Sequence, residues 1–379
     1  MRDWSQCYRR LDSFQIDSGE VEVWYSSELA DPRWDEFLRG TPFGQFQQSS
    51  MWAEYKAIEG WHHHRIILTD AFGIAGGFQI LWKKNRMGRV GYVSKGPVTH
   101  PESAGLARQM GLLLAGTAKE LGLTALIAQL PDETSLDQDI CVEAGFIRSN
   151  PMDVIEATCL VEIADGMEAV RSRMHPSIRK NVRKARRNMV STRDGTEADL
   201  TCFFDLMAAT CARQNTVPNP ASVGALQKLW RIFSPAKSIR LVLAECEGRS
   251  PAGQLCLAFG NRVTLWKKGW DGTHPNWHTT ELLEDATFEW SHANGYKICD
   301  FCSIERSTAL RILSGKPADG DGSRSRDAFN LRFGGVPKIL PSSQILIPNS
   351  IMRWGYRNIF ARVEQYRSRG QSTKDGTPS

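Results

Sequence analysis

The chain has 379 residues, of which 41% are hydrophobic and 23% are charged, values typical of a globular protein and not of a disordered or fibrous one. This length is enough for two domains that each bury a core. The net charge of +5 is unevenly distributed, because residues 171–193 carry nine Arg or Lys and no acid, which leaves −4 elsewhere (+5 for the whole chain less +9). The asymmetry indicates an anionic partner.

The expected compartment is the cytoplasm. No run approaches the roughly 18 apolar residues that a membrane span needs, and the N-terminal sequence has no apolar region of a secretory signal. The nine cysteines are odd in number and scattered, mostly within apolar segments, which favours reduced thiols over a disulfide framework.

In the first half, periodicity predicts helices around residues 32–39 and 48–60, and Gly60 ends the second of them. Apolar strands follow; they are expected over 65–70, 72–84 and 88–98. A long helix over 102–121, a buried strand over 123–130, a short helix before Gly145 and a strand over 154–163 complete this half.

The second half repeats this order. Helices are predicted over 177–190, 197–214 and 220–233, and strands over 238–246, 251–260 and 262–270. A helix containing Leu282 and Trp290 then ends at Gly295, before the buried strand YKICDF. Both halves contain a helix, a glycine and a buried strand in succession, as KELGLTALIAQL and SHANGYKICDF show. We therefore expect an α/β (α+β) fold with an internal repeat of about 170 residues.

Three segments lie outside the repeat. Residues 315–327 are rich in glycine and mixed charge and are expected to form a mobile loop. Residues 370–379 are expected to be a disordered tail. Residues 349–369 are typical of a terminal helix whose apolar side needs a cover.

The segment RSRMHPSIRKNVRKARRN, residues 171–188, contains the basic cluster. Pro176 is typical of a helix start, and Ile178, Val182 and Ala185 form an apolar stripe. Two basic rows flank the stripe: Arg179, Arg183, Arg186 and Lys180, Lys184, Arg187. A solvated helical face is the plain alternative, but like charges at this spacing destabilise a helix, so an anion-binding face is favoured. The pattern leaves RNA and phosphate both open.

Metal and nucleophile chemistry are not indicated. His62, His63 and His64 are consecutive, so their side chains cannot easily converge on one ion, and the C-x-x-C of residues 299–302 has no second ligand pair. The motifs G-x-S-x-G, GxxxxGK[ST] and G-x-G-x-x-G are absent. So is [QR]-x-x-G-x-[GA], with which many acetyltransferases hold coenzyme A. We expect no metal, no covalent intermediate and no tightly bound cofactor.

Several motifs together resemble the Fem-type aminoacyltransferase family. QSSMWAEYK matches that family's Q-S-x-x-W-x-x-x-K helix, with Gln48, Ser49, Trp52 and Lys56 in place. The basic helix, Arg213, the CDF containing Asp300 and the late segment FNLRFGG (329–335) follow in the family's order. The resemblance covers about residues 33–360 and is fairly specific as a set.

The resemblance implies two tandem GNAT-like acyltransferase domains with mixed, mostly antiparallel central sheets. The first would comprise residues 1–157 and 341–379, with the C-terminal helix packed on it, and the second residues 158–340. Known members transfer an amino acid from a charged tRNA to an amine, usually on a peptidoglycan precursor. Aminoacyl-tRNA, or acyl-CoA, would be a co-substrate, and the protein is expected to be a monomer without a transmembrane segment. Peripheral contact with a membrane stays open.

By the same resemblance, Lys56, Trp52 and Arg213 bind the acceptor's phosphate or carboxylate, and the residue 179–187 face binds tRNA or another polyanion. Asp300 would orient the amine. The family's F-K-x-x-F-G lysine is Asn330 here. If the segment is a strand, Arg332 shares a face with position 330 and would stabilise the oxyanion.

Two other functions are compatible with the sequence. One is a CoA-dependent N-acyltransferase on the same fold, against which the absent pyrophosphate loop counts. The other is a non-catalytic nucleic-acid-binding protein that uses the basic helix, whose binding would depend steeply on salt and would not require Lys56.

Overall fold

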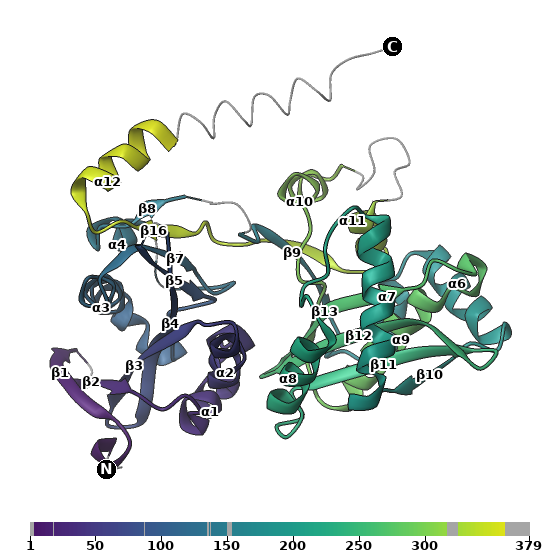
Figure 1. The fold of residues 1–379 in the computed structure, drawn as a ribbon, viewed down its shortest axis with the longest axis horizontal. Coiled ribbons are helices and arrows are strands. Elements are labelled where there is room, and N and C mark those ends of the chain that lie inside the picture. Colours follow the sequence, from purple (N-terminus) through teal and green to yellow (C-terminus); the bar gives the residue numbers. More distant parts are fainter. Residues whose placement is uncertain are drawn as a thin grey trace.

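The computed structural model describes residues 4–360 except 18, 87, 135, 137, 150–153 and 317–324. The predicted tail at 370–379 and most of the predicted loop at 315–327 lie outside these residues. The described chain forms two mixed sheets, each with its own helices (Figure 1). No helix in the described part is long and apolar enough to cross a membrane.

The first sheet contains nine strands. In spatial order they are β1 (Arg9–Ile16), β2 (Gly19–Ser26), β3 (His62–Asp70), β4 (Gly73–Asn85), β5 (Gly88–Ser94), β7 (Leu123–Gln129), β16 (Gln344–Leu346) and β8 (Ile147–Arg148), with β6 (Val98–Thr99) paired to β4. Its helices are α1 (Pro32–Gly40), α2 (Ser50–Ile58), α3 (Ala107–Glu120) and α4 (Gln138–Glu143).

The second sheet contains seven strands. Their order is β10 (Ser191–Asp194), β11 (Ile239–Cys246), β12 (Arg249–Phe259), β13 (Arg262–Trp270), β14 (Ile298–Asp300), β9 (Ala157–Glu162) and β15 (Val336–Ile339). Its helices are α5 (Met167–Arg173), α6 (Pro176–Arg187), α7 (Leu200–Arg213), α8 (Val223–Phe233), α9 (Thr279–Ala293), α10 (Arg306–Leu313) and α11 (Arg326–Leu331).

The two sheets share one topological feature. Among the described strands, only β5–β7 and β13–β14 pair in parallel, and each of these pairs is connected through a long helix, α3 or α9. A glycine with positive φ follows each helix, Gly122 (φ 60°) or Gly295 (φ 80°), which is the left-handed geometry that ends a helix. The predicted α/β fold with mixed, mostly antiparallel sheets is therefore confirmed.

Several elements were not predicted from the sequence. The β1–β2 hairpin was missed because β1, RRLDSFQI, is exposed or half-exposed along its whole length and has no clear apolar alternation. The short strands β10, β15 and β16 were also missed. The prediction of a strand near Asn330 was wrong, because this residue lies in helix α11.

The chain crosses from the second sheet back to the first after β15. Strand β16 inserts between β7 and β8 of the first sheet, more than 200 residues after β7 in the sequence (Figure 1). Helix α12 (Ser350–Gly355) and a π-helical turn (Tyr356–Phe360) follow. Tyr356 packs against the cluster of Ile127 and Ile345, whereas Ile351 and Trp354 are 79% and 65% exposed.

Three large apolar clusters hold the molecule together. One lies between the first sheet and α3, and one lies between the second sheet and α6 and α9. The third joins the domains, since it contains Trp34 and Tyr55 from the first and Leu226, Phe233 and Leu257 from the second. The face of the second sheet that carries α7 and α8, opposite α6 and α9, is thus packed against the first domain through this shared core.

A buried ion pair fixes α1 to the first sheet. Arg65 on β3 is fully buried and its guanidinium lies 3.3 Å from Asp31, the N-cap residue of α1. Arg65 also donates hydrogen bonds to Gln79 Oε1 (2.6 Å) and to Ser26 Oγ (3.2 Å). Removal of the guanidinium would therefore leave a buried carboxylate without its cation.

We predict that Arg65→Ala lowers the free energy of unfolding by about 3–5 kcal/mol, the usual cost of an uncompensated buried charge. Arg108→Ala is the matched control, because Arg108 and Glu143 form an exposed ion pair at 2.9 Å, which is expected to contribute about 0–1 kcal/mol. Urea denaturation of the two variants measures both values. Equal losses would contradict the assigned role of Arg65.

Candidate active site at the domain junction

Helix α2 carries the Q-S-x-x-W-x-x-x-K motif, and its first two residues are structural. Gln48 is buried; its amide donates to Ser94 O (2.8 Å) and its Oε1 accepts from Gln79 N (2.8 Å). Ser49 is the N-cap of α2, with its hydroxyl accepting from Trp52 N at 3.1 Å. These contacts fix the start of the helix on the sheet, and Trp52 and Lys56 follow one turn apart.

Trp52 connects the two domains. Its ring packs edge-to-face on Phe46 and on Trp266 of β13, with centroids 5.2 and 6.3 Å away. Lys56 Nζ lies 5.5 Å from the Trp52 ring centroid and forms an ion pair with Glu59. Lys56 is therefore at the domain junction, with its ammonium over an aromatic surface.

Strand β13 brings two adjacent lysines to this region, and sequence reasoning missed both. Lys267 Nζ lies 4.9 Å from the Trp266 ring centroid, and burial lowers the pKa of Lys267. Lys268 forms an ion pair with the fully buried Glu284 of α9 and lies 5.2 Å from the Phe329 ring centroid. The signal in the sequence was the pair of adjacent lysines in the middle of the strand RVTLWKKGW.

Arg213 ends helix α7 beside the last residue of β13. Its guanidinium stacks on Trp270 at 4.8 Å and donates to Trp270 O at 2.5 Å and to Thr210 Oγ1 at 3.2 Å. These contacts orient an exposed guanidinium, which has five N–H donors, and leave donors available for an anion.

Asp300 lies inside a chain of alternating charges that joins the domains. Asp132 of the first domain lies 2.8 Å from Lys95 Nζ and 2.7 Å from Arg262 of β13. Arg262 in turn lies 2.9 Å from Asp300, which also accepts from Thr158 Oγ1 at 2.5 Å. Burial alone would raise the pKa of Asp132, but Lys95 and Arg262 outweigh it and hold that pKa well below its usual range.

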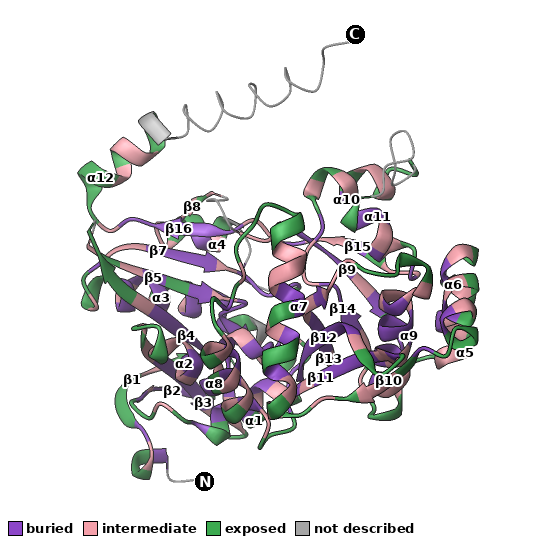
Figure 2. Cartoon of the chain, turned by 45° about the vertical axis from the view of Figure 1, so that its right-hand side comes forward, coloured by how far each residue is buried: buried purple, intermediate pink, exposed green. Residues whose placement is uncertain are grey.

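The basic helix α6 packs on α9, with Ile178, Val182 and Ala185 buried as predicted. Its exposed side faces away from the domain core in Figure 2. One of its six cations has a structural partner, since Arg186 lies 2.9 Å from the buried Asp285 of α9. Among the described residues, the other five form no ion pair with a carboxylate: Arg179, Lys180, Arg183, Lys184 and Arg187.

The late segment around Asn330 differs from its expected geometry. Residues 326–331 are helical, so positions 330 and 332 point roughly 200° apart and do not share a face. Asn330 is 5% exposed, whereas Arg332 is exposed. The prediction that Arg332 shares a strand face with position 330 was therefore wrong. Arg332 O instead accepts from His175 N, the N-cap of α6, at 2.8 Å, which ties α6 to this segment.

The structure thus separates the predicted residues into two groups. Trp52, Lys56 and Arg213 lie on the side of the second sheet that faces α7 and the first domain. The basic helix lies on the opposite side with α9. Pairing between β13 and β14 ends at Thr264 and Asp300, so the rest of β13, with Lys267, has no strand partner on that side.

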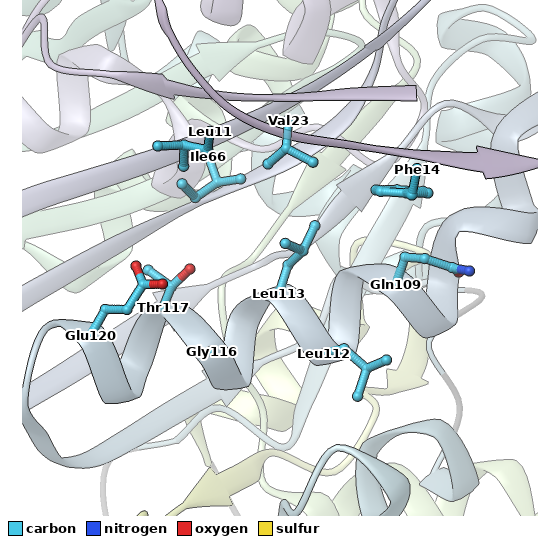
Figure 3. Close-up of a pocket in the computed structure, with 10 residues that line it drawn as sticks. All are labelled: Leu11, Phe14, Val23, Ile66, Gln109, Leu112, Leu113, Gly116, Thr117 and Glu120. Carbon is cyan, nitrogen blue, oxygen red and sulfur yellow. The ribbon is translucent and has the colours of Figure 1, made fainter. Parts of the chain in front are cut away.

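Other features of the sequence have structural explanations. His62 stacks on Trp82 and His64 on Tyr25, and burial lowers the pKa of His64 to about 4. No group of three metal-ligating side chains occurs among the described residues, and all nine cysteines are free. A mainly apolar hollow between α3 and the β1–β3 side of the first sheet contains none of the predicted site residues (Figure 3).

Comparison with known proteins gives a consistent result. A model of the acetyltransferase (GNAT) domain family matches residues 172–306. The UDP-N-acetylmuramoylpentapeptide-lysine N(6)-alanyltransferase of Weissella viridescens is 23% identical over 300 residues, covering 73% of this chain and 86% of that enzyme. In fold, the crystal structure of FemX matches with a TM-score of 0.72 at 15% identity, covering 92% of this chain and 100% of that one.

A second solved structure shares the fold more distantly. The C-terminal domain of a putative lysylphosphatidylglycerol synthetase from Agrobacterium fabrum has a TM-score of 0.50 at 14% identity, covering 83% of this chain and 93% of that one. With its two sheets and GNAT match, the protein is an acyltransferase built from tandem GNAT-like domains. Within this class its motifs resemble those of the Fem-type family, and the proteins similar to it include the Weissella viridescens alanyltransferase in sequence and FemX in fold.

We predict that Asp132 makes the junction sensitive to acid. Because its folded pKa lies below the unfolded value of about 3.9, its contribution to stability is complete above that pH and is lost as pH falls through the folded pKa. Asp132→Asn should therefore be less stable than the parent at pH 7, with a difference that shrinks toward pH 2. Denaturant titrations at several pH values measure this difference, and a constant difference would contradict the prediction.

Proposed function

We propose that the protein transfers an aminoacyl group from aminoacyl-tRNA to an amine of a phosphorylated cell-wall precursor. The single observation that carries this proposal is the placement of two cationic surfaces on opposite sides of the second sheet. One comprises Lys56 and Arg213 at the domain junction, and the other comprises the unpaired cations of α6. Two anionic substrates can then bind without competing for the same surface.

The junction suits the acceptor. Lys56 and Arg213 come from different domains, and each lies against a tryptophan, Trp52 or Trp270. Cations held in this way can bind phosphate and keep an amine at a defined distance. The similar Weissella viridescens enzyme is named for a uridine-diphosphate-linked pentapeptide with a lysine side-chain amine. An acceptor of this chemistry supplies both the anion and the nucleophile.

The α6 surface suits the donor. Five cations of this twelve-residue helix have no carboxylate partner among the described residues, a pattern typical of a surface for a polyanion. Acyl-CoA is the alternative donor, but the segment between β13 and α9, DGTHPNWH, has no [QR]-x-x-G-x-[GA] loop. A tRNA-dependent reaction agrees with this absence and with a cytoplasmic site of action, where charged tRNA occurs.

The reaction is aminolysis of an ester. A neutral amine attacks the ester carbonyl, the C–N bond forms, the C–O bond to the ribose breaks, and the proton lost by the amine ends on the ribose oxygen. No enzyme nucleophile is needed when both substrates are held in line, because positioning alone lowers the barrier by several kcal/mol. The protein then has to provide positive charge where the oxyanion develops.

The proposal is tested by incubating the protein with a mixed pool of charged tRNAs, with and without amine acceptors that carry a diphosphate. We expect acceptor-dependent loss of at least one aminoacyl-tRNA. If the protein transferred an acyl group from acyl-CoA but not from aminoacyl-tRNA, the donor would be acyl-CoA and the tRNA part of the proposal would be rejected. Nucleic-acid binding without any transfer would indicate a non-catalytic protein and would reject the proposal.

We predict that Lys180→Ala/Arg183→Ala weakens use of the donor only. Two lost phosphate contacts should raise the KM for aminoacyl-tRNA about tenfold or more and reduce the salt dependence of binding by about two units, with the acceptor KM unchanged. Arg231→Ala/Lys237→Ala is the control, because it removes the same charge from exposed positions near the end of α8. Equal effects of the two double variants would contradict the assignment of α6.

A further inference from the structure

The two adjacent lysines of β13 have opposite environments. Lys268 points toward α9, where the fully buried Glu284 neutralises it. Lys267 points toward α7, beside Trp266, and its ammonium forms no hydrogen bond or ion pair with the described residues. The strand thus carries one lysine with a structural partner and one ammonium that has no counter-ion in the described part of the chain.

Lys267 lies just past the point where the two parallel strands stop pairing. The last paired residues are Thr264 of β13 and Asp300 of β14, and Lys267 follows Thr264 by three residues. Ligands of open α/β sheets bind beyond the carboxyl ends of such strands.

The ionisable groups that face Lys267 do not neutralise it. They are the thiols of Cys302, which follows β14, and Cys211, on α7. Burial raises the pKa of Cys302, so this thiol is uncharged at neutral pH. Lys267 Nζ lies over the Trp266 ring, which favours a cation, and Trp52, with Lys56 over its own ring, packs edge-to-face on Trp266. An unpaired, half-buried ammonium in these surroundings is suited to a substrate anion or oxyanion.

This chain also lacks the family's lysine in the late segment. Position 330 is an uncharged, buried Asn, and Arg332 is exposed on another side of the helix end. Position 330 therefore supplies no positive charge to a reacting carbonyl, and a cation on another element can do so. Lys267 fits this role because it lies beyond the last parallel pair of β13 and β14 and because no described carboxylate forms an ion pair with it.

We propose that Lys267 is a catalytic residue whose ammonium donates a hydrogen bond to the carbonyl oxygen of the reacting acyl group. This inference rests on the proposed function, since it requires acyl transfer to an amine. As the C–N bond forms and the C–O bond breaks, Lys267 keeps its proton and stabilises the oxyanion. The ribose oxygen leaves with the proton that the amine loses.

The test compares Lys267→Met and Lys267→Arg with the parent protein in single-turnover transfer assays, using aminoacyl-tRNA and acyl-CoA as separate donors. Lys267→Met should lower kcat about 100- to 1,000-fold, as loss of an oxyanion donor usually does, with both KM values changed less than about threefold. Lys267→Arg should recover part of the rate. Thermal unfolding of each variant shows whether the fold is retained.

The pH profile separates a chemical role from a structural one. Because burial lowers the pKa of Lys267, the parent should lose activity on the alkaline side as the ammonium deprotonates. Arginine stays protonated there, so the alkaline limb of Lys267→Arg should move to higher pH. An unmoved limb would overturn the assignment, as would a Lys267→Met kcat within threefold of the parent.

Failure of the inference can be distinguished from failure of the proposed function. If the parent transfers no acyl group from either donor, both fail. If the parent is active and Lys267→Met raises only the acceptor KM, Lys267 binds the acceptor's anion, and only the catalytic assignment is overturned. Lys56→Ala gives the reference for that outcome, because it is expected to raise the acceptor KM with little change in kcat.

Discussion

The geometry of the site depends on one guanidinium. Arg262 lies between Asp132 of the first domain and Asp300 of the second, within 2.9 Å of each, and it begins the strand that carries Trp266 and Lys267. Asp300 ends the strand that pairs with it. This bridge fixes the start of β13 with respect to the first domain. It therefore also fixes the distance between Lys56 and β13. A buried bridge is costly to break because either carboxylate would then remain unpaired.

The family motifs combine two kinds of residue. Gln48 and Ser49 hold helix α2 on the first sheet, whereas Trp52 reaches Trp266 of the second domain and Lys56 lies over the Trp52 ring. In α6, Arg186 fixes the helix to the buried Asp285, while its neighbours remain available for a ligand. Substitutions within one motif are therefore expected to have different effects. Changes at the residues that hold the helices in place should lower stability, and changes at the cations that remain available should weaken substrate binding.

Local patterns predicted the long apolar elements well, including the strands of LTALIAQL and RVTLWKKGW and the buried stripe of α6. They could not predict contacts set by the tertiary structure. The Asp132–Arg262 bridge joins residues 130 positions apart, and β16 is three residues long, too short for a periodic signal. The helix at Asn330 was predicted as a strand because the short segment FNLRFGG carries no periodicity that distinguishes the two. Lys267 was missed because only the pairing of β13 and β14 shows that it lies beyond the last parallel pair.

Strand β16 has a consequence for biosynthesis. The first sheet contains a strand that the ribosome makes more than 200 residues after β7. At about 5–20 residues per second, β7 waits for roughly ten to forty seconds with one edge unpaired. During that interval the nascent first domain exposes strand edges that can pair with another chain. The protein therefore needs its whole second domain before its first can close, and the two domains mature as one unit.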